Sequence, residues 1–250
     1  MGILLAAIVL IKPPLAIIIT YFIIRRRWRV VGGFAATLVA IAGTSLLLFG
    51  VDLHVSWYQN CIQPFAGKAI GAYNVQSVDS FLVRFLTNDN VTNWELLELG
   101  ANFRLLRYLL FSILIGSTVW TCWKSKTPTT PEVENLELSI FLCLALLISP
   151  ISWMHYYSLF LLPLCLYVSN KLAIPQRWLW SGLMLLSTLL LILPPIKKAA
   201  MQNPALRFFI FNFGISHFFF GGVLLLGIML AARWYNSRRS SEVREFRSLE

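Results

Sequence analysis

Long apolar runs, interrupted by short polar turns, set the pattern of this chain. A membrane-spanning helix needs roughly 20 apolar residues, and about seven runs approach or reach that length. The runs are Ile3–Ile24, Val30–Gly50, Leu105–Trp123, Leu136–Ile148, Tyr156–Val168, Trp178–Leu193 and Phe208–Ala232. The fourth and fifth have only 13 residues each, so we expect either one buried helical hairpin or two spans completed by their polar ends. The pattern predicts an all-α fold, a polytopic transmembrane helix bundle.

Composition agrees with this fold class and suggests one large membrane domain. Hydrophobic residues make up 58% of the chain and charged residues 13%. We expect residues 1–235 to form the transmembrane domain, with an extracytoplasmic loop at 51–104 inside it. Residues 236–250 alternate basic and acidic side chains without apolar periodicity, which is typical of a solvated tail.

The net charge of +10 follows the predicted topology. If the loops are numbered alternately, the set that begins with Arg25–Arg29 holds 13 of the 21 Lys and Arg residues, and the opposite set holds seven. The positive-inside rule places the larger set, with the C-terminal tail, in the cytoplasm of a multi-pass cell-membrane protein. Topology and contact with anionic membrane lipids therefore explain the basic excess, and we expect no nucleic acid partner.

The stretch Ser149–Tyr157 is the most unusual part of the pattern. Its proline, serines, tryptophan, histidine and tyrosines lie between two nearly pure hydrocarbon runs. Irregular backbone at membrane depth is tolerated only where it is buried in protein or lines a wet cavity. The simpler interpretation is a tight turn with interfacial aromatic anchors. We expect both: a turn at the interface that faces a functional site.

A second unusual feature is Lys12-Pro13-Pro14 inside the first apolar run. Proline removes a backbone donor and kinks a helix, and a lysine in a span must find a partner. Lys12 is 13 residues from Arg25, about 20 Å along a helix, so we expect it near the outer face. A snorkelling lysine is the alternative. The adjacent prolines favour a cation that lines a cavity and meets an anion.

The longest polar stretch, Val51–Asn102, carries many aromatic residues, and loops of this length are usually functional. Within it, Val78–Leu86 has the pattern of an amphipathic helix lying at the membrane interface. Ser77 is a suitable N-cap for that helix, and Asp79 lies in its first turn. Basic and polar groups from this loop, from Lys12 and from Ser149–Tyr157 are thus all expected at the outer face.

Several classes of protein are excluded or disfavoured. The chain has no Walker loop, no dinucleotide glycine fingerprint, no His-Glu-x-x-His and no Gly-x-Ser-x-Gly. Its four cysteines show no metal-binding or disulfide spacing, so we expect neither a metal nor a cofactor. The spans lack the paired acids and bases of a proton-coupled carrier. All acidic residues lie in loops or tails except Glu137, which lies at the end of a span.

Cations together with amide, hydroxyl and aromatic groups at an outer interface suit an anionic lipid head group beside a sugar. Phosphate is bound by Lys and Arg. Sugar rings pack on Trp and Tyr, and their hydroxyls bond to Asn, Gln and Ser. The residues predicted to bind substrate are Lys12, Asn74, Gln76, Ser77, Arg84, Ser149, Ser152, Trp153 and Tyr156, with Lys197 and Lys198 as a further outer basic pair.

At these residues the chain resembles the C-terminal part of glycosyltransferase family 87. The resemblance rests on Lys12-Pro13-Pro14, Arg25–Arg29, Asn74–Ser77 with Arg84, and the string Ser149–Tyr156, and it extends to about Val168. It implies a GT-C-type integral membrane enzyme. Such an enzyme transfers a hexose, in characterised members mannose, from a polyprenyl-phosphate sugar to a lipid or glycan acceptor outside the cytoplasm.

The chain departs from the family in one respect. The resemblance implies a general-base aspartate in the first outer loop, followed by several spans, and this chain begins at what matches a mid-protein span. We therefore expect the GT-C fold to be incomplete at its N-terminus, with a second polypeptide supplying those spans. Within the chain, the candidates for catalysis are His155 and Asp79, because a displacement needs a base within hydrogen-bond reach of the acceptor hydroxyl. Asp79 has the alternative role of helix cap.

The leading hypothesis is a membrane glycosyltransferase, or the C-terminal part of one. Lys12 and Arg84 would offset the phosphate charge, and His155 would orient or deprotonate the acceptor. Two alternatives remain open at this point. One is a lipid or polysaccharide flippase or export subunit without chemistry of its own, and the other is an inactive fragment that begins at an internal methionine.

Overall fold

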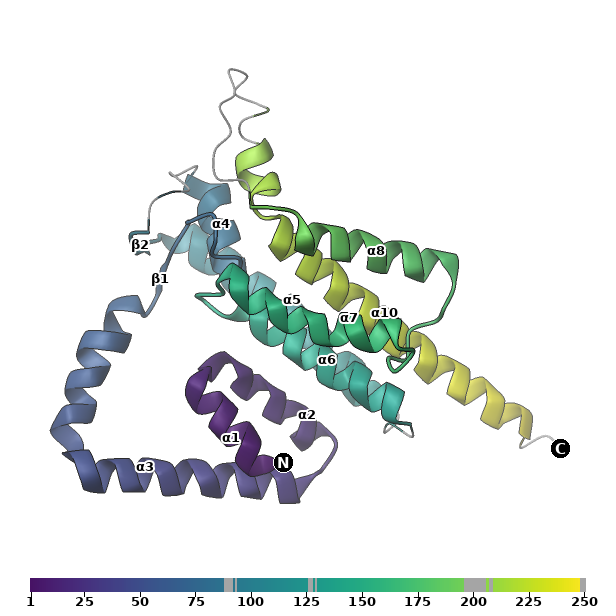
Figure 1. Ribbon diagram of the computed structural model, residues 1–250, viewed down its shortest axis with the longest axis horizontal. Helices are drawn as coiled ribbons and strands as arrows, with labels where there is room; N and C mark the ends of the chain where they lie inside the picture. The colour runs from purple at the N-terminus through teal and green to yellow at the C-terminus, as the bar shows by residue number, and fades with distance from the viewer. Residues whose placement is uncertain are drawn as a thin grey trace.

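The computed structural model is mostly helical (Figure 1). It describes residues 1–87, 92, 94–125, 128, 130–195, 206 and 209–247, with the side chains of 211 and 239–247 excepted. The main helices are α1 (Gly2–Ile11), α2 (Ile18–Ile24), α3 (Trp28–Trp57), α4 (Val78–Thr87), α5 (Ala101–Lys124), α6 (Pro131–Ile148), α7 (Leu161–Val168), α8 (Trp178–Ile192) and α10 (His217–Arg247). Short helical segments are η1 (Pro13–Ile17), η2 (Tyr58–Ile62), η3 (Gln63–Phe65), η4 (Met154–Phe160) and η5 (Ile210–Gly214), and β1 (Lys68–Ala69) pairs with β2 (Leu97–Glu98) as a small antiparallel ribbon.

Three helices in the described part of the chain are long and apolar enough to cross a membrane. They are Trp28–Phe65, Ala101–Lys124 and His217–Arg238. Shorter apolar helices cover Gly2–Ile11, Pro13–Ile24, Met154–Val168 and Trp178–Ile192. These helices indicate association with a membrane. Each predicted apolar run thus contains helix, although several are too short to span a bilayer by themselves.

The first predicted span is the main difference from the sequence pattern. Instead of one kinked helix over Ile3–Ile24, α1 and the η1–α2 segment fold back on each other as a hairpin with Lys12 at its turn (Figure 1). Lys12 leaves the helical region with φ −137° and ψ 85°, and the proline that follows has no backbone donor to continue the helix. The N-terminus therefore lies beside the start of α3. A Cβ atom on Gly2 would be 2.3 Å from the carbonyl oxygen of Val30, so this contact requires glycine.

Helix α3 bends sharply where the second predicted span ends. Gly50 has φ 72° and ψ 168° inside the helix, a conformation that favours glycine. His54, which follows the bend, hydrogen-bonds through Nδ1 to the carbonyl oxygen of Gly50 at 2.7 Å. Its Nε2 lies 2.9 Å from Oγ of Ser45, which precedes the bend. The predicted outer loop therefore starts with helix that continues to Phe65.

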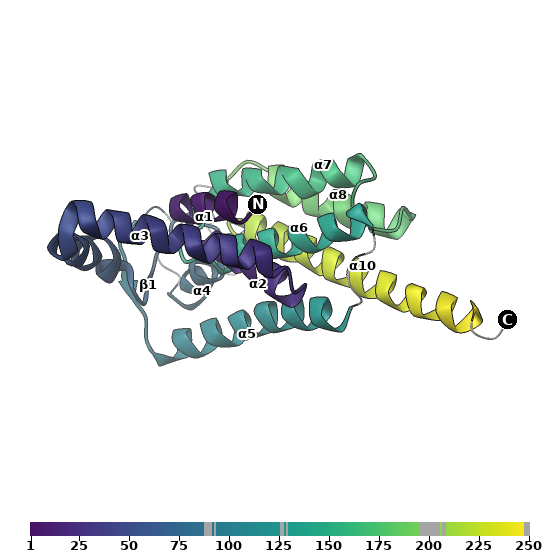
Figure 2. The ribbon, with the colours of Figure 1, turned by 90° about the horizontal axis from the view of Figure 1, so that it is seen from below.

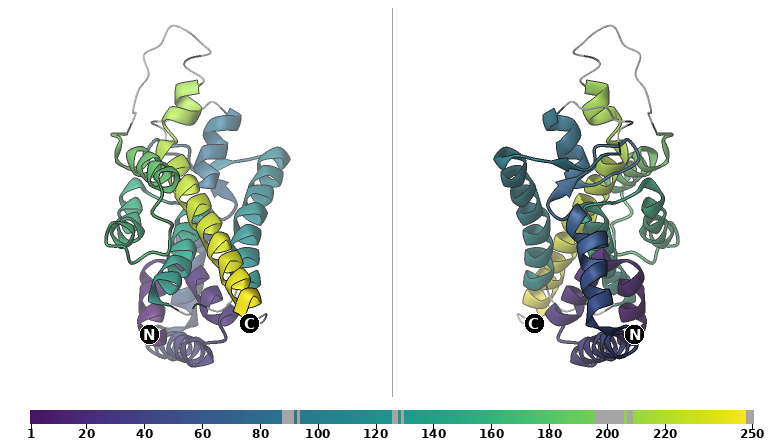
Figure 3. Two further views of the ribbon diagram at one scale, coloured as in Figure 1. Left: turned by 90° about the vertical axis from the view of Figure 1, so that its right-hand side faces the viewer. Right: turned by 90° about the vertical axis from the view of Figure 1, so that its left-hand side faces the viewer.

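Helix α6 forms the centre of the bundle. Every residue from Ser139 to Leu147 is buried, as expected for a helix surrounded by other helices. Its largest packing partner is α10, which runs the length of the bundle (Figure 2). Cys143 Sγ donates to the Gly222 carbonyl oxygen at 3.3 Å, which shows how closely the two helices approach. Figure 3 shows α10 between α5 and the α6–α7 pair.

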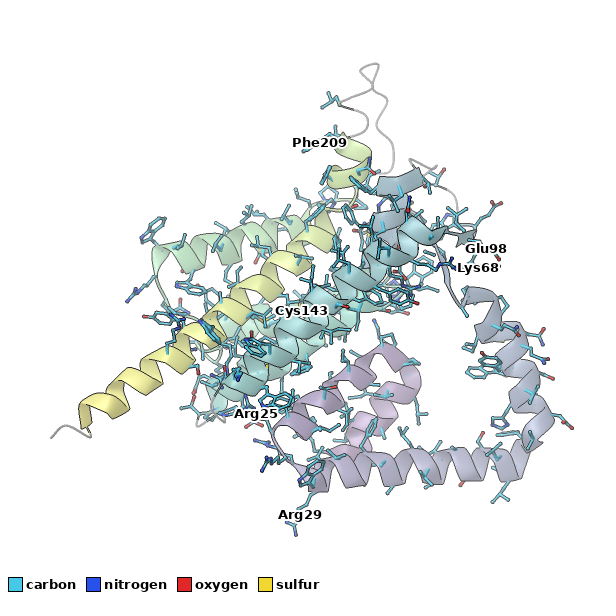
Figure 4. The ribbon with its side chains drawn as sticks, turned by 180° about the vertical axis from the view of Figure 1, so that it is seen from behind. Arg25, Arg29, Lys68, Glu98, Cys143 and Phe209 are labelled. Atoms are coloured by element: carbon cyan, nitrogen blue, oxygen red, sulfur yellow. The ribbon has the colours of Figure 1, made fainter. Side chains whose placement is uncertain are left out.

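The two ends of the bundle differ in character, and we name them the Arg25 end and the α4 end. Figure 4 shows Arg25 at one end, the Lys68–Glu98 ion pair (3.2 Å) at the other, and Cys143 between them. Helix α10 continues to Arg247 at the Arg25 end, through most of the segment 236–250 predicted as a tail. Residues Lys197 and Lys198 lie outside the described residues.

A buried ionic cluster joins four helices at the Arg25 end. The carboxylate of Glu137 accepts Arg25 Nε and Arg233 Nε, each at 2.7 Å, and a further bond from Arg25 Nη2. The Arg25 guanidinium also donates to the carbonyl oxygens of Cys122 and Ser125 at the end of α5, at 2.9 and 3.2 Å. From the sequence, the charge of Arg25–Arg29 serves only to assign the orientation in the membrane. The structure shows that Arg25, the first residue of this run, also joins α2 to α5 and α6.

Candidate functional site

Two predicted site segments, far apart in sequence, pair at the α4 end. Val75 and Trp153 form an isolated antiparallel bridge. The Gln76 amide donates to the Ser152 carbonyl oxygen at 2.7 Å, and the Met154 amide donates to the Asn74 carbonyl oxygen at 2.8 Å. The predicted turn after α6 is therefore held by the segment that leads into α4, and the site is built on this pairing.

Gln76 connects that pairing to the rest of the bundle. Its Nε2 donates to the carbonyl oxygens of Tyr73 (2.7 Å) and Ile215 (2.8 Å), and its Oε1 accepts the Phe219 amide at 3.4 Å. The Gln76 carbonyl oxygen accepts the buried hydroxyl of Tyr157 at 2.6 Å. Gln76 is fully buried, so its side chain links the loop to the start of α10 and its backbone links the loop to η4.

Ser77 has the capping position that the sequence predicts. Its Oγ accepts the Ser80 amide at 3.2 Å, three residues into α4, which is the N-cap geometry. The same hydroxyl lies 3.2 Å from the Pro150 carbonyl oxygen, to which it donates. Helix α4 coincides with the predicted amphipathic helix, but it packs on α5, α6 and η5 and is largely buried, so it does not lie freely on a surface.

Asp79, in the first turn of α4, is fully buried. Its Oδ1 lies 3.0 Å from Arg107 Nε, at an angle that gives an ion pair without a hydrogen bond. Burial raises the pKa of Asp79 to about 6, and the nearby Arg107 charge opposes the rise. The carboxyl is therefore held between helices α4 and α5, shielded from solvent.

Arg84 lies behind the loop, also buried. Its Nη1 donates to the carbonyl oxygens of Gly71, Ala72 and Val75 at 3.0–3.3 Å, and its Nε donates to Ser216 Oγ at 3.1 Å. Burial lowers the pKa of this guanidinium to about 9, so it remains a cation at neutral pH. Three of its four hydrogen bonds, all from Nη1, therefore fix the backbone of the loop, and Nη2 remains without a partner in the described structure.

Lys12 and His155 meet at one aromatic ring. The Lys12 ammonium lies 3.0 Å from the centre of the Tyr156 ring, and the His155 ring centre is 4.4 Å from the same ring. The ammonium is shielded from solvent and has no hydrogen-bond partner among the described residues. His155 is exposed. The turn of the N-terminal hairpin thus brings a cation from the start of the chain to the predicted site.

Aromatic rings extend the site from Tyr156 toward the segment that contains Tyr73 and Trp94. The Trp153 ring stacks on the Trp94 ring at 5.3 Å, with an interplanar angle of 27°, and lies 6.5 Å from the His155 ring. Tyr73 meets Trp94 edge to face at 6.2 Å. Sequence reasoning placed neither Tyr73 nor Trp94 in the site, because each is one of several aromatic residues in a long loop and its partner is distant in sequence.

Four predicted binding residues carry shielded polar atoms without a hydrogen-bond partner in the described part of the chain. They are the Lys12 ammonium, Asn74 Oδ1, Arg84 Nη2 and Ser152 Oγ. Buried polar groups are normally satisfied, so such atoms mark a place where a polar ligand or water can bind. Ser149, by contrast, donates locally to the Ile151 carbonyl oxygen at 3.4 Å. Within the described residues, no group of three or more His, Cys, Asp or Glu side chains is placed to hold a metal ion.

These features can perform a definite set of tasks. A desolvated ammonium can stabilise an anion, exposed imidazole can accept a proton, and aromatic rings with amide and hydroxyl groups can hold a sugar. The structure brings Lys12, Asn74, Ser152, Trp153, His155 and Tyr156 together around the loop pairing. It places Gln76, Ser77, Asp79 and Arg84 in the contacts that support it.

Comparison with known proteins identifies the family. The model of glycosyltransferase family 87 matches residues 1–150, more than half of the chain, and the match ends just before Trp153. No curated protein and no solved structure matches the chain. The family implies a sugar donor and an acceptor. The chain belongs to glycosyltransferase family 87.

Proposed function

We propose that this protein transfers a hexose from a polyprenyl-phosphate sugar to a lipid or glycan acceptor at the α4 end of the bundle, and that the hexose is mannose. The Lys12 ammonium supports this most directly. It is shielded from water, lies against Tyr156 and has no anion within the described structure. An isolated buried charge is costly, and a phosphate group on the donor would provide the opposite charge.

The other groups around Lys12 suit the remaining parts of the reaction. Trp153 and Tyr156 offer aromatic surface to the sugar, and Asn74 and Ser152 offer hydrogen bonds to its hydroxyls. The acceptor oxygen attacks the anomeric carbon as the bond from that carbon to the phosphate oxygen breaks. The leaving polyprenyl phosphate takes the electron pair, and Lys12 stabilises its charge. His155 accepts the proton of the acceptor hydroxyl.

Gln76, Ser77, Asp79 and Arg84 have supporting roles in this proposal. Their side chains hold the loop pairing and α4 in position through the contacts described above. Ser149 shapes the turn after α6. Asp79 is unsuited to be the base, since it is fully buried and paired with Arg107.

The topology proposed with this function places the α4 end outside the cytoplasm and the Arg25 end inside. Residues 1–235 form the membrane domain and 236–250 the cytoplasmic tail. The hairpin puts the N-terminus at the Arg25 end, beside the start of α3. Both termini are then cytoplasmic, which protease protection in oriented vesicles measures with tags on each terminus.

The reaction is tested with protein reconstituted into liposomes that contain polyprenyl-phosphate mannose and a lipid acceptor. We expect Lys12→Gln to lower transfer at least tenfold and Lys12→Arg to retain part of it, because a cation is kept. Lys68→Gln is the matched control. Lys68 is also a lysine at the α4 end, but Glu98 already neutralises it.

His155→Ala tests the proposed base. Loss of transfer with retained donor binding assigns the proton transfer to His155. Unchanged turnover shows that His155 is not the base. If wild-type liposomes move the sugar lipid between leaflets without forming product, the protein is a flippase and the proposal fails.

A further inference from the structure

A second site, unrelated to the sugar donor, lies between α7 and α8. Helix α7 packs on α6, and α8 packs on α10. Because each helix has a different neighbour, a cavity of about 570 Å³ remains between them. Its walls are apolar, with Leu161, Leu164 and Val168 from α7 and Met184 and Leu185 from α8.

This apolar cavity ends in polar groups toward the Arg25 end. Tyr167 and Ser181 both line it, and their hydroxyls lie 2.9 Å apart. Ser169, at the end of α7, completes the polar edge. The cavity is therefore mainly apolar, with a polar edge toward the Arg25 end.

A second cavity, of about 350 Å³, lies beside the turn that precedes α8. It is lined by the turn Ala173–Arg177 and by Tyr235 and Asn236 of α10. The turn is held in place because the Ala173 amide donates to the Glu132 carbonyl oxygen at 3.3 Å and Asn236 Nδ2 donates to the Ala173 carbonyl oxygen at 2.7 Å. The lining of this cavity combines apolar residues with the polar side chains of Gln176, Arg177 and Asn236, and Arg177 is exposed. We name this cavity the polar cavity.

Both cavities are lined by residues at the start of α8. Arg177 is the N-cap of α8, and its carbonyl oxygen accepts the Ser181 amide at 3.0 Å, one helical turn later. Arg177 lines the polar cavity and Ser181 the apolar one, so a cation lies about one helical turn from the polar edge of the apolar cavity.

The surroundings place that cation where a lipid head group would be. Lys171, also exposed, lies two residues before the turn Ala173–Arg177. Trp178, 85% exposed, begins α8 in the manner of an interfacial anchor. Basic side chains at such a position attract anionic head groups, at about 1 kcal/mol for each Lys or Arg. Neither the turn nor the Tyr235–Asn236 wall contributes an acidic side chain to the polar cavity.

We propose that an anionic phospholipid binds here, with one acyl chain between α7 and α8 and its phosphate beside Arg177 and Lys171. The site is at the opposite end of the molecule from Lys12, so the lipid is neither donor nor acceptor. It fills the gap between two helices that do not otherwise pack closely. The lipid therefore supports the η4–α7 segment, which follows the turn at Ser149–Trp153.

The test uses the full-length protein in nanodiscs that contain either phosphatidylglycerol or phosphatidylcholine with a photoreactive group in the acyl chain. We expect cross-links to concentrate on residues 161–169 and 181–188, with phosphatidylglycerol favoured. Since 1 kcal/mol is about a fivefold change in affinity, the double variant K171Q/R177Q should lose about 25-fold of that preference. The double variant R29Q/K124Q removes two exposed charges at the same end and should keep it.

A pair of tryptophan substitutions tests the apolar part. Cys165 lines the cavity and is exposed, whereas Leu162, which is also exposed, does not line it. Cys165→Trp should abolish the cross-links and Leu162→Trp should leave them. Cross-links spread evenly over all exposed apolar helices, equal labelling by the two lipids, or a second copy of the chain cross-linked at this face would each overturn the proposal. Transfer activity is not the readout, so failure here leaves the proposed function untouched.

Discussion

Replacing Glu137 by Gln should destabilise the protein far more than the same change three residues away. Glu137 is fully buried and is the carboxylate that two arginines share. The amide keeps the size of the side chain but leaves Arg25 and Arg233 as buried cations that repel each other. Breaking a buried pair by removing one partner costs about 3–5 kcal/mol, and we expect a loss in that range.

Glu134→Gln is the matched control on the same helix. Glu134 pairs with Arg27 at 2.6 Å, but the two side chains are 30% and 40% exposed. Exposed pairs contribute about 0–1 kcal/mol. The expected difference between the two variants is therefore more than about 2 kcal/mol, although both remove one carboxylate charge from α6.

Denaturant unfolding of the detergent-solubilised protein, followed by tryptophan fluorescence, measures the difference in stability between the two variants. The rate of thiol labelling shows which part of the protein is loosened. Cys122 and Cys143 are both buried, but the carbonyl group of Cys122 binds Arg25, whereas Cys143 lies in the middle of α6. In Glu137→Gln, Cys122 should react faster and Cys143 should not. Equal unfolding midpoints for the two glutamine variants, or an unchanged Cys122, would refute the stabilising role of the cluster.

Three further predictions concern the α4 end. The pKa of Asp79 is about 6 in the folded protein against an ordinary value of 3.8, so the folded state binds the proton more tightly than the unfolded state. The free energy of unfolding should therefore fall by up to about 3 kcal/mol as the pH rises from about 4 to about 6. Asp79→Asn should show no such fall in unfolding midpoints measured across that range. Ser77→Ala should cost about 1 kcal/mol through loss of the N-cap bond to the Ser80 amide, and Ser77→Asn should restore most of it in the same unfolding assay. Tyr157→Phe should cost about 1 kcal/mol or more by leaving the buried Gln76 carbonyl oxygen without its hydroxyl donor, and increased protease sensitivity of the loop would accompany it; an unchanged midpoint would contradict the assignment.

Local signals in the sequence are sufficient for much of the fold. The apolar runs predict helices in the right places, and Ser77 with Asp79 predicts the start of α4 to the residue. Length and hydropathy fail at the first run, because they cannot distinguish a span from two short helices folded back at Lys12-Pro13-Pro14. The close approach of Gly2 to Val30 that fixes this hairpin is a tertiary contact with no local pattern.

The candidate site shows the same division. Residue types identify Lys12 and Ser149–Tyr157, since charge and irregular backbone are conspicuous among apolar residues. Residue types do not reveal which polar side chains face a ligand and which hold the backbone. Arg84 has the chemistry of a phosphate ligand, yet three of its four hydrogen bonds go to carbonyl groups of the loop. Only the packing of α4 under that loop determines this role.

One hairpin connects the two ends of the molecule, and this makes the site depend on the buried cluster. Lys12 precedes η1 and Arg25 follows α2, so the two cations flank one continuous helical segment of 12 residues, about 18 Å long. Bonds from Arg25 to Glu137 fix one end of the segment, and packing of η1 and α2 on α6 holds its length. Loss of the Glu137 carboxylate should therefore displace Lys12 and raise the KM for the donor, while leaving the KM for the acceptor unchanged.

Because this effect acts through Lys12, Glu137→Gln should change the donor KM little once Lys12 is already Gln, and the double variant should match Lys12→Gln alone. Additive effects of the two substitutions on the donor KM, measured below the unfolding range, would show that the cluster supports stability without positioning Lys12.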